Sequence, residues 1–135
     1  MLEATKRVFL AVSAAMAIGY VYYDPDINPL AKTFFKIVPT FQHGELVAPL
    51  VGTAIAKTLL AFFIYSYVYN RNDSLWQLVR MASDLTFMSA LLQFTHYLWT
   101  PTDLRVLGIN TLYDLIITVV ISIIVGYKRF HVKVI

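Results

Sequence analysis

The stretch from residue 106 to residue 127 has the sequence VLGINTLYDLIITVVISIIVGY, in which Asp114 is the one formally charged side chain. Its twenty-two residues match the roughly 20 that an α-helix needs to cross a bilayer. An apolar run of this length is too long for the core of a soluble domain. The stretch therefore predicts a transmembrane helix and an all-α, polytopic integral membrane protein.

Three further stretches have the same character, over residues 8–23, 46–69 and 75–99. With 106–127 they predict four transmembrane helices in a single transmembrane domain, residues 1–135. The first stretch follows two basic residues and contains Ala15-Met16-Ala17, which is also typical of a signal peptide. Because the chain retains Met1, we expect an uncleaved helix.

The connection over residues 24–44 is polar and interrupted by prolines. Within it, residues 30–38 are typical of a short helix, because Asn28 can cap its start and Pro29 suits its first turn. Two lysines share one face of this segment, and much of the remainder is apolar. We expect a short helix in the membrane interface, with an ordered loop as the alternative.

Composition supports the same class of protein. Of 135 residues, 59% are hydrophobic and 14% are charged, against roughly a quarter charged in soluble domains. Mean hydropathy is +0.65. The net charge of +3 does not predict a nucleic-acid partner, because the basic residues lie at helix ends and not in one patch. Without cysteine the chain cannot use a thiol nucleophile or hold an iron–sulfur cluster.

Basic residues flank the predicted spans unequally on the two sides. One side has six and the other three: Lys6, Arg7, Arg71, Lys128, Arg129 and Lys133 against Lys32, Lys36 and Arg105. By the positive-inside rule, both termini should lie in the cytoplasm. Aromatic residues gather near the span ends, as expected for an aromatic belt.

Four charged side chains lie inside the predicted spans and sum to zero: Lys57, Arg80, Asp84 and Asp114. A charge near the bilayer centre costs at least ~2.5–3.5 kcal/mol, so such residues usually have partners. Both aspartates lie within ~4–5 Å of the depth of Lys57, at 1.5 Å per residue. We expect Lys57 to meet one of them, directly or through water. Arg80 can pair with Asp84, one turn away. With Asn110, these residues form a predicted intramembrane network that fits an ion or proton relay, a headgroup site or a purely structural role.

The predicted third span is polar on two opposite faces. One face carries Gln77, Arg80 and Asp84, and the other carries Thr86, Ser89, Gln93 and His96. Both faces should be shielded from lipid, which predicts a central position for this helix, either in the bundle or in an oligomer. Gln93 and His96 form a candidate polar face in its outer half.

Two ladders of small residues predict close helix contact. Ala11, Ala15 and Gly19 lie four apart in the first span, and Ala48, Gly52 and Ala56 do so in the second. Small residues let membrane helices approach closely, so we expect these two ladders to face each other.

No catalytic or metal-binding motif is evident. His43 and His96 could approach one surface and ligate haem, but His43-Gly44-Glu45 is too sparse for a metal motif, and His131 lies apart from both. There is no serine–histidine or glycine-rich phosphate motif. We therefore expect no enzymatic activity, no catalytic residues and no cofactor or metal.

The second and fourth spans end in Tyr69-Asn70-Arg71 and Tyr127-Lys128-Arg129-Phe130. Four short helices closed in pairs by an aromatic–Asn/Lys–Arg signature resemble the GtrA-like family of small membrane proteins. The resemblance covers residues 46–130. It implies movement of polyprenyl-phosphate-linked sugars, with Asn70, Arg71, Lys128 and Arg129 as phosphate-contacting residues. The alternative interpretation is that these four residues only anchor the helix ends at the cytoplasmic side, according to the positive-inside rule.

Two classes of function remain open. One is a small transporter, flippase or channel-like protein, expected to be a homo-oligomer because four short helices enclose little volume. The other is an accessory or structural subunit that packs against a larger integral membrane complex. Charges within the spans favour the first class, and the absence of any motif favours the second.

Overall fold

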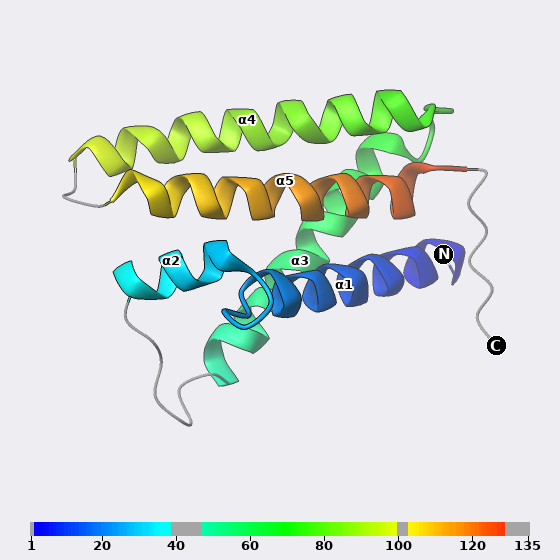
Figure 1. Ribbon diagram of the computed structural model, residues 1–135. Helices are drawn as coiled ribbons and strands as arrows, with labels where there is room; N and C mark the ends of the chain where they lie inside the picture. Colours follow the sequence, from blue (N-terminus) through cyan, green and yellow to red (C-terminus); the bar gives the residue numbers. More distant parts are fainter. Residues whose placement is uncertain (1, 39–46, 100–102, 129–135) are drawn as a thin grey trace.

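The computed structural model describes residues 2–38, 47–99 and 103–128. Within them the chain is all-α, with five helices (Figure 1). Their bounds are α1 Leu2–Tyr22, α2 Pro29–Ile37, α3 Val47–Val68, α4 Leu75–Trp99 and α5 Leu104–Gly126. The helices predicted from the sequence are all present. α1 begins six residues before its predicted start, and the other bounds agree within two residues.

Three of the helices, α1, α3 and α5, are long and apolar enough to cross a membrane. α4 has 25 residues, a length of about 37 Å, which also suffices for a span. It is less apolar because Arg80, Asp84 and several uncharged polar residues lie along it. The expectation of spans is thus supported for three helices, and the fourth span stays a prediction.

Local capping explains where the shorter elements begin. The Asn28 carboxamide oxygen accepts a hydrogen bond from the Leu30 N–H at 3.1 Å, and its Nδ2 donates to the Tyr22 carbonyl at 2.7 Å. The same side chain therefore starts α2 and ties it to the end of α1. The helix predicted over residues 30–38 is confirmed, with both of its ends one residue earlier. Its place in the membrane interface stays a prediction.

α4 and α5 also begin at defined caps. Ser74 and Gln77 form a capping box, with the Ser74 N–H donating to Gln77 Oε1 at 2.8 Å and the Gln77 N–H donating to Ser74 Oγ at 3.2 Å. Asp103 caps α5 by accepting from the Arg105 N–H at 2.9 Å. Hydrogen bonds from the Arg105 side chain hold the pKa of Asp103 below its ordinary value.

The helix at the centre of the molecule is α5. It contacts each of the other four helices, with α4 along one side and α1 and α2 along the other (Figure 1). Ile117, Ile121 and Val125 are almost fully buried between these neighbours. Within the single chain α4 is therefore not the central helix, since it packs chiefly on α5 and leaves its outer side open; a central position in an oligomer stays a prediction.

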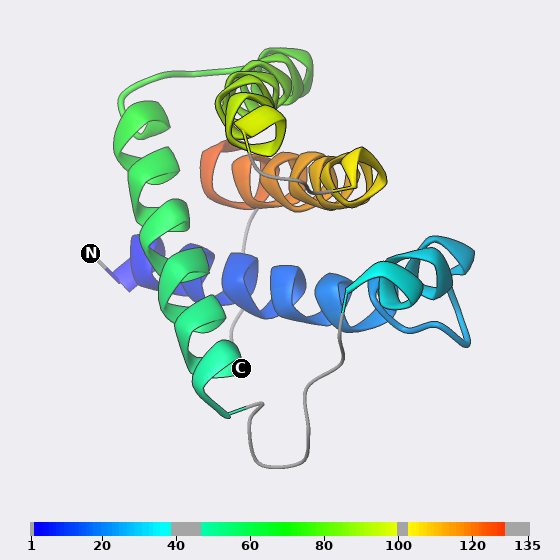
Figure 2. The ribbon, with the colours of Figure 1, turned by 90° about the vertical axis from the view of Figure 1, so that its left-hand side faces the viewer.

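α3 crosses the other helices obliquely, as the two perpendicular views show (Figures 1 and 2). Its C-terminal half packs through Ala61, Ile64 and Val68, which are buried. Residues of its N-terminal half, such as Leu50 and Ile55, are exposed. The arrangement is therefore not a regular bundle of parallel and antiparallel helices.

The ladder of small residues in α1 is buried, but it does not face the ladder in α3. Ala11 and Ala15 are fully buried, and a Cβ at Gly19 would lie 2.8 Å from the Tyr113 hydroxyl of α5. By contrast, Ala48, Gly52 and Ala56 are exposed, and a Cβ at Gly52 would meet nothing within 4 Å. The expected crossing through both ladders is wrong, because Tyr113 occupies the space that Gly19 leaves.

The two tryptophans can test whether α4 spans the membrane. Trp76 and Trp99 lie near opposite ends of α4, and both are exposed. If α4 spans, each should lie at a membrane interface. The variants Trp76→Phe and Trp99→Phe each keep one tryptophan. We expect its fluorescence to be quenched more by lipids brominated near the headgroup than by lipids brominated deep in the acyl chains. Strongest quenching by deep bromines, or none by any, would show that α4 does not span.

Candidate functional site

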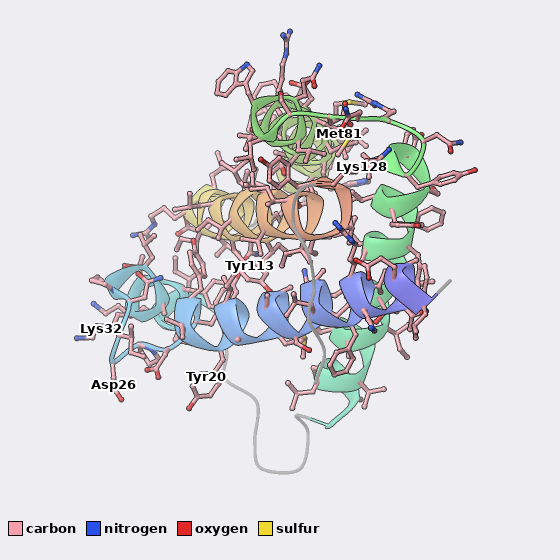
Figure 3. The ribbon with its side chains drawn as sticks, turned by 90° about the vertical axis from the view of Figure 1, so that its right-hand side faces the viewer. Tyr20, Asp26, Lys32, Met81, Tyr113 and Lys128 are labelled. Atoms are coloured by element: carbon pink, nitrogen blue, oxygen red, sulfur yellow. The ribbon has the colours of Figure 1, made fainter. Side chains whose placement is uncertain are left out.

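Aromatic and charged side chains from three long helices meet where the end of α1 crosses the first half of α5. Tyr113 of α5 lies at the middle of this cluster, between α5 and α1 (Figure 3). Its ring centroid is 5.4 Å from that of Tyr22 and 5.1 Å from that of Tyr23. Phe34 of α2 packs edge-on against Tyr23 at 5.2 Å. The cluster thus joins α1, α2 and α5, and Lys57 adds α3.

Two tyrosine hydroxyls fix the end of α1 to α5. Tyr22 donates to the Ile109 carbonyl, and Tyr23 donates to Asn110 Oδ1, each at 2.5 Å. Asn110 thus has a tyrosine as its partner, and its place in a network with the charged residues of the spans stays a prediction.

Lys57 reaches this cluster from the middle of α3. Its Nζ lies 5.0 Å from the centroid of the Tyr113 ring, which is cation–π geometry. The charges of Lys57 and Asp114 act on one another, although the described residues contain no ion pair between them within 4.0 Å. Of the two aspartates proposed as partners of Lys57, the structure thus places Asp114 in its vicinity, and Tyr113 is an additional partner.

Arg80 and Asp84 are not part of this cluster. Both are exposed on α4, and neither belongs to an ion pair within 4.0 Å in the described part of the chain. Gln77 on the same face is also exposed. The residues of the single predicted network therefore lie in two places. One group surrounds Tyr113, and the other consists of the two exposed charged residues on α4. Within the described residues, no ion pair connects any of the four charges to another.

The second polar face of α4 is only partly covered. Gln93 is half-buried and its Nε2 donates to Ser89 Oγ at 3.4 Å, while His96 is exposed. The expectation that both polar faces are shielded from lipid is not met within one chain. His43 and His131 lie outside the described residues, and within the described part no three His, Asp or Glu side chains are grouped as metal ligands.

Of the residues expected at the cytoplasmic ends, Asn70 and Arg71 follow α3 and Lys128 follows α5. Asn70, Arg71 and Lys128 are exposed, and Arg71 Nη2 donates to Asp73 Oδ1 at 3.1 Å. Arg129 lies outside the described residues. A role of these residues in contacting phosphate stays a prediction.

Arg7 has a structural role that sequence reasoning missed. Its Nη1 donates to the Ile124 carbonyl at 3.1 Å and to the Tyr127 carbonyl at 2.9 Å, and its Nε donates to Glu3 at 3.0 Å. Arg7 is 7% exposed, so this cation is buried against the C-terminal end of α5, where helix carbonyls lack intrahelical partners. The spacing of four residues between Glu3 and Arg7 indicates that these two side chains can pair within α1. The hydrogen bonds of Arg7 to the carbonyls of α5 can be seen only in the folded structure.

A groove of about 820 Å³ runs between α4 and α5. Its lining combines small or weakly polar residues with large apolar ones, and it includes Asp84. Ser83 and Thr111 represent the first kind, and Phe87 and Leu91 the second. The groove is therefore an apolar surface with one acidic group.

Comparisons with protein-family models, with curated proteins and with solved structures find no match to the chain. The resemblance to the GtrA-like family accordingly stays a prediction.

Proposed function

We propose that the chain is a non-enzymatic, multi-pass membrane protein that functions through lateral contact with other membrane helices, as an accessory or structural subunit of an assembly. The observation that carries this proposal is the exposed pair Arg80 and Asp84 on the outer side of α4. We also propose that both termini are cytoplasmic. The start of α1 and the end of α5 lie together, joined by Arg7, at the end of the molecule with more basic residues.

The depth of Asp84 makes lipid an unfavourable neighbour. Asp84 is nine residues from the start of α4, about 14 Å along the helix axis, close to the middle of a hydrocarbon core of about 30 Å. An aspartate side chain is too short to reach the interface from there. An exposed carboxylate at this depth costs at least ~2.5 kcal/mol, so a protein or water partner is strongly favoured.

Transport is the second candidate, favoured by Lys57 and Asp114. These opposite charges lie well inside α3 and α5 without a direct ion pair. In an intramembrane protein such groups often serve ions or charged substrates. The Tyr113 ring beside Lys57 supports the structural role instead. It gives the Lys57 ammonium a partner within the protein, so that no transported ion is needed to balance it.

The particle mass distinguishes the proposed subunit from an isolated protein. We expect native mass spectrometry of membranes extracted without detergent to find the chain in particles that contain more than one polypeptide. A particle holding one copy of this chain with lipid alone would contradict the proposal. Transport would gain support if proteoliposomes of the pure chain moved a charged solute and Lys57→Met abolished that movement.

A further inference from the structure

The outer side of α4 carries a regular seam of exposed residues. The seam consists of seven residues whose spacings along the chain alternate between three and four: Gln77, Arg80, Asp84, Phe87, Leu91, Phe94 and Leu98. This is the heptad spacing with which one helix packs along another. In the described structure no element of this chain covers the seam, since α4 packs chiefly on α5 through Leu78, Ala82 and Thr86. The seam therefore has the pattern of a helix–helix contact without a partner in the chain.

The seam and the groove between α4 and α5 form one continuous surface. Asp84, Phe87, Leu91 and Phe94 belong to the seam and also line the groove. The opposite wall belongs to α5, where a Cβ at Gly108 would meet nothing within 4 Å. Small residues beside large ones admit a neighbouring helix at short range. The surface thus fits a helix of the kind that α4 itself presents.

The two charged residues of the seam are complementary to those of an identical seam on a second copy of the chain. Arg80 and Asp84 are opposite in sign and one turn apart, and neither is paired within the described residues. When two parallel copies of a helix pack along the same seam, neighbouring layers interdigitate. Arg80 of each copy then reaches Asp84 of the other, and the apolar layers from Phe87 onward match one another. A two-fold axis requires such reciprocal contacts, in which each residue meets its complement twice.

We propose that two copies of this chain associate in parallel through the α4 seam, so that the α4–α5 hairpins of both form a four-helix arrangement. Parallel copies follow from a single membrane orientation, which the unequal distribution of basic residues supports. The inference rests on the proposed function and deepens it by naming the first partner as a second copy. The outer charges of one chain are neutralised by those of the other, away from lipid.

Cysteine cross-linking tests the dimer directly, because the natural chain has no cysteine. Leu91 on the seam and Leu59 on α3 are almost equally exposed, at 53% and 54%, and form a matched pair. In native membranes treated with copper phenanthroline, Leu91→Cys should shift from monomer to dimer mass on a non-reducing gel. Leu59→Cys should remain at monomer mass. Equal cross-linking of the two variants, or none at Leu91→Cys, would overturn the proposal.

Charge exchange tests the reciprocal pairing in the Leu91→Cys background. Arg80→Glu and Asp84→Arg alone should each abolish the dimer shift, because each leaves like charges facing across the seam. The double variant Arg80→Glu/Asp84→Arg should restore the shift. Single variants that still insert into membranes and cross-link as before would contradict the pairing. If no dimer forms but the chain occurs in particles with other proteins, the second copy is wrong and the proposed function stands; a lone monomer contradicts both.

Discussion

Tyr113→Ala is expected to lower the free energy of unfolding by about 3–5 kcal/mol, the usual loss when a large buried aromatic side chain is removed. The Tyr113 ring contacts Tyr22 and Tyr23, lies beneath the Lys57 ammonium and occupies the space left by Gly19. Its loss opens a cavity where α1, α3 and α5 meet. The measurement is reversible unfolding in mixed micelles, followed by circular dichroism during titration with dodecyl sulfate.

Tyr67→Ala is the control for this change. Tyr67 lies on α3 with 70% of its surface exposed, so its removal leaves no cavity within the chain. Its effect should stay near 0.5 kcal/mol, as for most surface substitutions. Equal losses for Tyr113→Ala and Tyr67→Ala would show that the cluster around Tyr113 does not hold the helices together.

Arg7→Met should be the second strongly destabilising change, lowering the free energy of unfolding by about 3 kcal/mol. The substitution keeps a long apolar stem but removes the donors to the Ile124 and Tyr127 carbonyls. Each hydrogen bond to a charged group contributes about 1.5–3 kcal/mol, and the carbonyls at the end of α5 lose their partner. The same dodecyl sulfate titration measures this loss.

Arg7→Lys and Arg105→Met complete that series. A lysine carries the charge but lacks the planar fork that reaches two carbonyls and Glu3 together, so Arg7→Lys should recover only part of the stability. Arg105 pairs with Asp103 at the exposed start of α5, and Arg105→Met should change stability little. If Arg7→Met were no more harmful than Arg105→Met, the hydrogen bonds of Arg7 to the end of α5 would not stabilise the fold.

The starts of α2 and α4 could be predicted to within one residue because their signals are local. Asn28 and Pro29 mark the start of α2, and the capping box of Ser74 and Gln77 marks that of α4. Both depend on residues within one turn of each other, so no knowledge of packing is needed.

Packing between the helices could not be predicted from the same signals. In a membrane, apolar residues face lipid and protein equally well, so nothing in the sequence of α5 distinguishes a central helix from a peripheral one. The ladder around Ala15 correctly indicated a close contact, but not that Tyr113 would supply it. The ladder around Gly52 is exposed within the chain. Arg80 and Asp84 in α4 predicted ion-pair partners, and within the described residues neither side chain has one.

The most direct measurement of the proposed role is the lipid accessibility of the outer side of α4. Phe87 on α4 and Phe63 on α3 are both 65% exposed in the single chain. We expect a spin label at Phe87→Cys in native-lipid membranes to be relaxed much less by oxygen, which concentrates in the acyl region, than one at Phe63→Cys. A covered α4 predicts this difference. Equal relaxation of both labels would show that α4 faces lipid and would contradict function through lateral helix contact.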